Sequence, residues 1–162
     1  MILPEIIRAE DFGGCWDSYL DHLYGVFLDN FVHEHVHFLG LRVTCRRTPE
    51  HRGKHSGFWH MISYGEVEDD REIEPRRCER LCWVKPLIEA AAANDPDVLC
   101  WENKRRTEKN ILIMHSTENF VVILGNRSDH LLLKTAYDLK PRRREKMLQE
   151  YRNSNDPRAG NS

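Results

Sequence analysis

The strongest constraint on the fold lies in the last third of the chain, where three short apolar runs follow a polar segment. The runs span 111–114, 120–124 and 131–133, and polar turns separate them at 116–118 and 125–129. Short apolar runs bounded by turns are typical of neighbouring β-strands, so the pattern predicts a strand meander. The middle run is apolar without alternation. We therefore expect its strand to be central and covered on both faces.

The other predicted elements place helices before and after this meander. Apolar residues at three- and four-residue spacing predict a helix over 11–30. Further elements are predicted as strands over 36–39, 41–45, 58–64 and 98–105 and as helices over 75–84, 87–93 and 141–152. We expect one α+β domain over 1–152, a mainly antiparallel sheet with helices packed against it, followed by a disordered tail over 153–162.

Bulk properties indicate an ordinary globular protein. The 162 residues are 40% hydrophobic and 31% charged, and no apolar run reaches the roughly 18 residues of a membrane span. The first residues lack a basic segment followed by a long apolar stretch, so no signal peptide is predicted and we expect a cytoplasmic protein with no membrane partner. The cysteines, which we expect to be reduced, are Cys15, Cys45, Cys78, Cys82 and Cys100.

The charges are unevenly distributed along a chain whose net charge is only −2. Basic residues gather in 41–55, 104–109 and 140–146, and acidic residues gather in 66–74. One such run alone is typical of a solvated surface. Three basic runs beside the same predicted sheet favour a cleft that attracts phosphate.

Alternation along the predicted strands sorts their side chains by face. The sets that share a face are Trp101, Asn103 and Arg105 in 98–105, Leu133, Thr135 and Tyr137 in the last strand, and Phe58, His60, Ile62 and Tyr64 in 58–64. A sheet that brings these faces together would group His60, Arg105, Thr135 and Tyr137.

These motifs resemble a phage- and prophage-associated branch of the BECR ribonucleases, the group that joins barnase, EndoU, colicin-type and RelE-like nucleases. The resemblance covers about 41–152, and the motifs that carry it are Gly57-Phe58-Trp59-His60, Trp101-x-Asn103-x-Arg105, the apolar meander and Thr135-Ala136-Tyr137. It implies a small α+β fold and a metal-independent ribonuclease without a cofactor, acting as a toxin or in phage–host conflict. An antitoxin or immunity protein is the partner that such a role implies.

The resemblance implies RNA cleavage by attack of a ribose 2′-hydroxyl on the adjacent phosphate. His60 would transfer a proton, Arg105 would stabilise the phosphorane, Thr135 would bond a phosphate oxygen, and Tyr137 would stack on a base or assist proton transfer. RNA-binding residues are expected at Arg46, Arg47, Lys54, Asn103 and Lys134. Several branches of the family use two histidines, and the candidates for a second one here are His51, His55 and His115.

Other interpretations of the same residues stay open. His60 also fits a half-buried structural histidine, and Arg105 fits a solvated charge at the sheet rim. The fold would also suit a non-catalytic module that binds RNA or protein. A zinc-dependent hydrolase is a third hypothesis, because His33, His35 and His37 alternate and would share one face of a strand.

Overall fold

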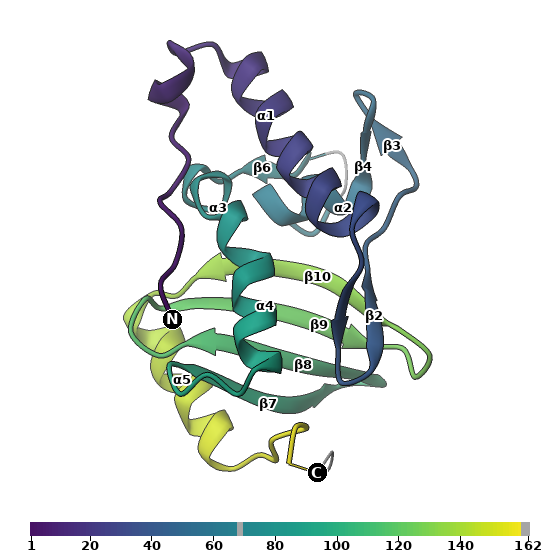
Figure 1. Ribbon diagram of the computed structural model, residues 1–162, viewed down its shortest axis with the longest axis vertical. Helices are drawn as coiled ribbons and strands as arrows, with labels where there is room; N and C mark the ends of the chain where they lie inside the picture. Colours follow the sequence, from purple (N-terminus) through teal and green to yellow (C-terminus); the bar gives the residue numbers. More distant parts are fainter. Residues whose placement is uncertain (68–69, 160–162) are drawn as a thin grey trace.

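A computed structural model describes residues 1–67 and 70–159, and it confirms the predicted meander (Figure 1). The four strands are β7 (Val98–Arg105), β8 (Glu108–His115), β9 (Phe120–Asn126) and β10 (Leu131–Asp138). Each pairs antiparallel with the next along the chain. Their spacing in the sequence is set by tight turns, so the local pattern was sufficient to place them.

A hairpin from the first third of the chain extends the meander to six strands. It consists of β1 (Val36–Phe38) and β2 (Leu41–Thr44), and the strand order of the sheet is β1-β2-β10-β9-β8-β7. The β2–β10 pair is parallel and short, since only Val43 and Thr44 face partners in β10. The sheet is therefore mixed, and the rest of the β10 edge lies beyond the end of β2.

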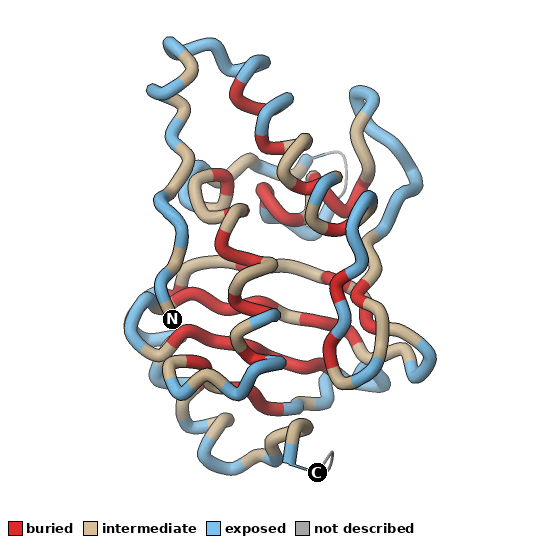
Figure 2. The backbone as a smooth tube through the Cα atoms, viewed as in Figure 1, coloured by how far each residue is buried: buried red, intermediate tan, exposed pale blue. Residues whose placement is uncertain are grey.

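Helices cover both faces of the sheet, and each face has its own apolar core. On one face α4 (Val84–Ala92) lies across the strands and α1 (Trp16–Leu28) lies towards the β10 side, and both contribute to the largest cluster of buried side chains (Figures 1 and 2). On the other face α5 (Pro141–Arg152) covers a smaller cluster of Trp101, Leu112, Met114, Val121, Leu139 and Met147. Residues of β9 belong to both clusters, so the prediction that this strand is covered on both faces is confirmed.

The predicted helix over 11–30 is interrupted at its start. A 3₁₀ turn, η1 (Ala9–Phe12), precedes α1, and a π-helical turn, η2 (Asp29–His33), follows it. Gly13 and Gly14 lie between η1 and α1 with positive φ angles, a conformation that glycine adopts without strain. The core side of α1 is Tyr19, Leu20, Leu23 and Phe27.

The segment 58–64, predicted as a strand, is a helix through most of its length. Helix α2 spans Ser56–Ile62, so the predicted face of Phe58, His60, Ile62 and Tyr64 does not exist. Phe58, Met61 and Ile62 are buried, which is the i, i+3, i+4 spacing of a helix face. Packing overrides the strand preference of the aromatic and β-branched residues.

The elements around α2 are short. The hairpin of β3 (Glu50–His51) and β4 (Lys54–His55) precedes it, and β5 (Ser63–Tyr64) follows and pairs with β6 (Glu72–Ile73). Part of the predicted acidic segment 66–74 lies outside the described residues.

Helices are present in the region of the predicted pair, 75–84 and 87–93, but the break lies near Arg80 and not at Pro86. The region consists of α3 (Pro75–Glu79), the 3₁₀ turn η4 (Leu81–Trp83) and α4, and Pro86 lies in the first turn of α4, where its missing N–H costs little.

The described part of the C-terminal segment, 153–159, makes contacts with the rest of the molecule. The Glu102 N–H on the outer edge of β7 donates to the Asn155 carbonyl at 3.2 Å. Arg158 Nη1 donates to the Ala91 carbonyl, also at 3.2 Å. Residues 153–159, expected as part of a disordered tail, thus contact the outer edge of β7 and the end of α4. The final three residues lie outside the described part of the chain.

The N-terminus is also fixed to the sheet. The Met1 ammonium lies 2.5 Å from an Asp97 oxygen and 3.3 Å from an Asp95 oxygen. Within the described residues, no helix is long and apolar enough to cross a membrane.

Candidate functional site

A β-bulge reshapes β10 at the point where β2 no longer covers its edge. The register shifts between Leu133 and Thr135, so Lys134 has no direct partner in β9. Leu133 therefore points into the α4 core, while Thr135 and Tyr137 point to the α5 side. The expectation that all three share one face is wrong for Leu133, because the bulge inverts the alternation.

Arg77, on α3, joins Thr135 and Tyr137 at this edge. Its Nη1 lies 3.3 Å from Thr135 Oγ1, to which it donates a hydrogen bond. The centre of its guanidinium lies 5.2 Å from the centroid of the Tyr137 ring, a cation–π contact. Helix α3 packs on β10, so the arginine is held against the strand by the fold itself. The structure thus brings a guanidinium, a hydroxyl and a phenol together.

A second arginine lies next to this group. The Ser63 carbonyl accepts from Arg77 Nη1 at 2.8 Å and from Arg71 Nη2 at 2.7 Å, and Ser63 Oγ accepts from Arg71 Nε at 2.9 Å. Burial and the positive charge of Arg71 lower the pKa of Arg77 below its ordinary value. Two guanidinium groups thus converge on one backbone carbonyl.

Among the described residues, Arg77 differs from the other arginines of 75–80 in having no carboxylate ion-pair partner. Arg76 pairs with Asp138 at 2.6 Å, and Arg80 pairs with Glu79 at 3.6 Å. Among the described residues, no Asp or Glu forms an ion pair with Arg77, whose side chain is half-buried. A half-buried cation that is bonded only to neutral groups is suited to receive an anion.

His60 lines a separate small cavity at the β10 bulge. The cavity is about 160 Å³ and is lined by Arg46, Gly57, His60, Leu132, Leu133 and Lys134. Gly57 packs closely against the backbone of Arg46, and its N–H donates to the Arg46 carbonyl. A Cβ at this position would lie only 2.7 Å from that carbonyl oxygen. His60 is one helical turn before Ser63, where the two arginines meet.

Arg105 lies at the other side of the same sheet face. As predicted, Trp101, Asn103 and Arg105 share a face, and all three donate to Glu150 on α5, at 2.9, 2.9 and 2.5 Å. Burial opposes ionisation of Glu150, but these hydrogen bonds outweigh it and lower its pKa. Arg105 is therefore engaged by a carboxylate, while its side chain stays 60% exposed.

A cavity of about 280 Å³ connects the two regions between the sheet and α5. Thr135 and Arg105 both line it, and its charged residues are Arg105, Lys134, Arg143, Lys146 and Glu150. The strand order places β7 three spacings from β10, about 14 Å at ~4.8 Å per spacing. The structure thus groups Thr135 with Tyr137 around Arg77, and it places His60 and Arg105 in different cavities that share Lys134.

The predicted RNA-binding residues divide between these cavities and the rest of the surface. Arg46 lies in the His60 cavity, whereas Asn103 and Lys134 lie in the α5 cavity. The Lys134 side chain passes over Gly125, and its Nζ donates to a Glu108 carboxylate oxygen at 2.6 Å. Arg47 is exposed, and Lys54 pairs with Asp21 at 3.0 Å.

The three candidates for a second histidine lie outside the cavity of His60. The His51 ring meets the edge of Trp59, and His55 lies 3.9 Å from Glu50. His115 is buried, and its Nδ1 accepts from the backbone N–H groups of the following turn. None of them therefore lines the same cavity as His60.

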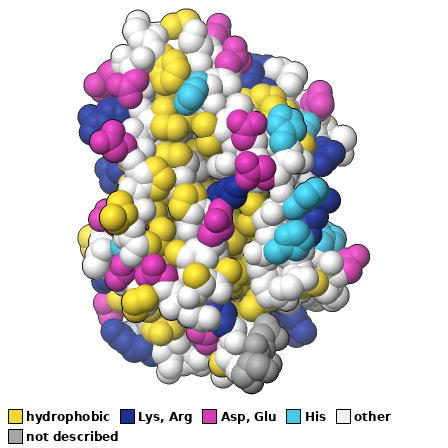
Figure 3. All heavy atoms as spheres, in the orientation of Figure 1, with side chains coloured by type: hydrophobic (Ala, Val, Ile, Leu, Met, Phe, Trp, Pro, Cys, Tyr) yellow, Lys and Arg dark blue, Asp and Glu magenta, His cyan; other side chains and the backbone are white. Residues whose placement is uncertain are grey.

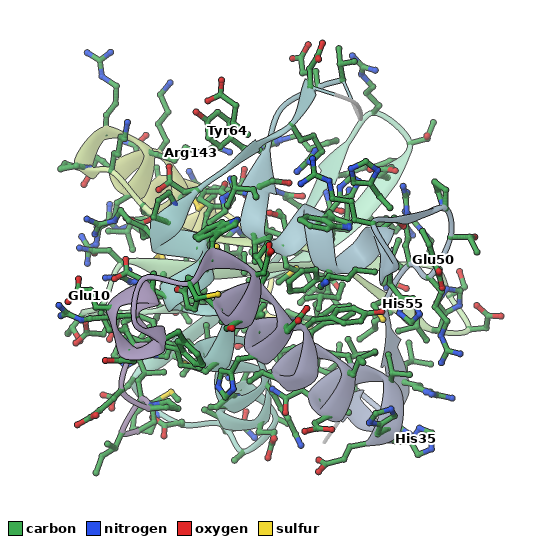
Figure 4. All side chains as sticks on the ribbon, turned by 90° about the horizontal axis from the view of Figure 1, so that it is seen from above. Glu10, His35, Glu50, His55, Tyr64 and Arg143 are labelled. Carbon is green, nitrogen blue, oxygen red and sulfur yellow. The ribbon has the colours of Figure 1, made fainter. Side chains whose placement is uncertain are left out.

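The alternating histidines 33, 35 and 37 do not form a ligand cluster. His33 closes η2 and lies 3.1 Å from Asp29, and His37 is on β1. Within 1–67 and 70–159, no three His, Cys, Asp or Glu side chains are placed to hold a metal ion. Figure 3 shows histidines gathered on the β2–β4 side of the α1 face, and Figure 4 shows His35 there, on the opposite side from Arg143.

Arg77, Arg71 and Ser63 were not predicted as site residues. The run Pro75-Arg76-Arg77-Cys78-Glu79-Arg80 indicates a helix start with three arginines, but its pattern does not say which of them faces β10. Their grouping depends on the contact between α3 and β10 and on the position of Ser63 after α2.

With this geometry established, comparison with known proteins adds no relative. No protein-family model, curated protein or solved structure matches the chain.

Proposed function

We propose that this protein is a metal-independent endoribonuclease of the BECR type, with its catalytic centre at the β10 edge. The observation that carries the proposal is Arg77, half-buried, bonded to the Thr135 hydroxyl and stacked over Tyr137 without a carboxylate partner among the described residues. This arrangement suits the anionic phosphorane that forms when a ribose 2′-hydroxyl attacks a phosphodiester. A guanidinium binds such oxygens in a bidentate manner, and a lysine does not.

The proposed reaction uses two proton-transfer groups. His60 accepts the proton of the 2′-hydroxyl as the oxygen–phosphorus bond forms. Tyr137 gives its phenolic proton to the 5′-oxygen as the bond from phosphorus to that oxygen breaks. The products are a 2′,3′-cyclic phosphate and a free 5′-hydroxyl. Arg77 lies over the Tyr137 ring, beside the phenolate that the second transfer leaves.

Thr135 has a positioning role in this scheme. Its oxygen accepts from Arg77, and its own proton remains for a phosphate oxygen. Thr135 and Tyr137 share a side because both follow the bulge at Lys134 and are two residues apart in the strand. Arg105, with its carboxylate partner and its distance from β10, is proposed to hold a flanking phosphate together with Lys134, Arg143 and Lys146.

The biological role that fits this chemistry is a toxin acting on RNA in phage–host conflict, held inactive by an antitoxin or immunity protein. The sequence resemblance supports this role, and the basic cavity between the sheet and α5 suits an RNA strand or an acidic partner that competes for it.

Digestion of a single-stranded RNA in the presence of EDTA tests the proposed reaction. We expect cleavage that persists with the chelator, products with 2′,3′-cyclic phosphate ends, and loss of cleavage in His60→Ala. The matched control is His22→Ala, which removes an exposed histidine on α1. RNA that is bound but never cut would favour the non-catalytic module, and cleavage that disappears with EDTA would favour a metal-dependent enzyme.

A further inference from the structure

A separate cavity of about 360 Å³ is lined in part by Arg71. Its lining includes His51, Trp59, Ser63 and Arg71. Its volume is at the lower end of the roughly 300–1,000 Å³ range for small-molecule sites, which suits a group the size of one nucleoside. Ser63 and Arg71 also belong to the cluster around Arg77. The cavity and the proposed catalytic centre therefore share a wall.

The Trp59 ring is held in a fixed orientation at this cavity. Its Nε1 donates to the His51 carbonyl at 2.8 Å. The Phe58 ring packs against it with centroids 5.4 Å apart, and the His51 ring meets it at 5.7 Å with an interplanar angle of 74°. The side chain stays partly exposed at the cavity wall. A rigid, partly exposed indole is a stacking surface that needs no reordering when a flat ring binds.

Arg71 provides the polar side of the same cavity. Its guanidinium is held by the Ser63 carbonyl at 2.7 Å and by the Gly65 carbonyl at 2.7 Å. Because Ser63 also receives Arg77, a ligand that contacts Arg71 from the cavity reaches the edge of the phosphate-binding cluster. The base of a nucleotide would thus bind in the cavity, and its phosphate would bind at the adjoining cluster around Arg77.

We propose that this cavity binds the nucleobase of the nucleotide that carries the scissile phosphate, with the base stacked on Trp59. The inference rests on the proposed ribonuclease function and names the place where the substrate is recognised. Stacking on an indole is tolerant of sequence, because every base has an aromatic face. The site therefore takes single-stranded RNA, whose bases are free to leave the stack, in preference to a duplex.

The test uses nucleoside 3′-monophosphates, which contain a base and a phosphate but no bond to cleave. Binding to the His60→Ala chain is followed by NMR through the indole N–H signals of the tryptophans. We expect the Trp59 signal to shift, Trp59→Leu to weaken binding about tenfold or more, and Trp59→Phe to keep most of it. Trp16→Leu is the matched control, because Trp16 is on α1 and 40% exposed.

Several outcomes distinguish this site from the reaction itself. Nucleotide binding that depends on Trp59 in a protein that never cuts RNA would support the base site and end the ribonuclease proposal. RNA cleavage with unchanged KM in a folded Trp59→Leu chain, with no shift of the Trp59 signal, would overturn the base site alone. Inorganic phosphate serves as a second probe. We expect it to shift the NMR signals of Arg71 and Arg77 and to leave the Trp59 signal unchanged. If Trp59→Leu unfolds, the comparison of Trp59→Phe with Arg71→Lys decides the same question.

Discussion

The two edges of the α5-covered sheet face carry an arginine each, and the two are held in opposite ways. At the β7 edge, Arg105 is exposed and bound to Glu150, which also receives Trp101 and Asn103. At the β10 edge, Arg77 is half-buried and bonded to a carbonyl and a hydroxyl. A paired charge contributes to structure, whereas a half-buried charge bonded to neutral groups is available for a ligand. This difference is the reason for placing the proposed catalytic centre at the β10 edge.

The most decisive way to break this comparison is to remove each arginine in turn. Arg77→Ala should lower kcat for RNA cleavage about 10²–10³-fold, the loss typical of one removed donor to a developing anion. Arg105→Ala should change kcat/KM by less than about tenfold, mainly through KM, since it positions a flanking phosphate. Steady-state kinetics on one RNA substrate measure both. A larger loss of kcat for Arg105→Ala than for Arg77→Ala would reverse the assignment.

The second-largest effect is expected where α2 packs against the Arg46 backbone. Gly57→Ala places a Cβ 2.7 Å from the Arg46 carbonyl oxygen, so we expect a loss of about 1–3 kcal/mol in the free energy of unfolding. Gly25→Ala is the matched control, because no atom lies within 4 Å of its Cβ and the site is inside α1. That change should stabilise by about 0.5–1 kcal/mol. Urea unfolding compares them, and equal midpoints would show that the Gly57 contact is not tight.

The basic cavity beside α5 should affect affinity more than rate. The double change Arg143→Ala with Lys146→Ala removes two cations that line this cavity. Each phosphate contact on a single strand contributes roughly 0.7 to the slope of log K against log salt, so the slope should become shallower by about 1.4. Binding is measured with the His60→Ala chain at several salt concentrations. An unchanged slope would mean that RNA does not follow this cavity.

The smallest effect concerns the carboxylate that holds Arg105. Because the folded-state pKa of Glu150 is lowered, its contribution to stability is present above the unfolded value of ~4.3 and is lost as pH falls through the folded pKa. Unfolding midpoints of the wild-type protein should therefore drop more steeply than those of Glu150→Gln as pH falls below ~4.3. Parallel curves for the two proteins would show that the ion pair contributes little.

The sequence predicts the regions of the molecule whose structure is set locally. Strand 98–105 and helix 141–152 were predicted with the bounds observed, because alternation in one and Pro141 in the other mark them directly. Segment 58–64 was wrong because its aromatic residues fit a strand by composition and a helix by spacing. The close contact of Gly57 with the Arg46 backbone, a tertiary feature, accompanies the helical outcome.

The candidate site was predicted only in part, for a related reason. Thr135 and Tyr137 were identified from their strand, but the bulge that turns Leu133 away has no mark in the sequence. Arg77 was missed because Arg76, Arg77 and Arg80 have similar local surroundings and acquire different partners only in the folded chain. His60 was selected, although on a helix instead of a strand, and its cavity adjoins the site through Lys134.

The most direct measurement is a crystal structure of the His60→Ala chain with a dinucleotide whose attacking 2′-hydroxyl is replaced by hydrogen. We expect the phosphate between the two nucleosides to accept from the Arg77 guanidinium and from the Thr135 hydroxyl, with the 5′-oxygen toward Tyr137. A phosphate bound instead at Arg105, with Arg77 still bonded only to Ser63 and Thr135, would contradict a catalytic centre at the β10 edge.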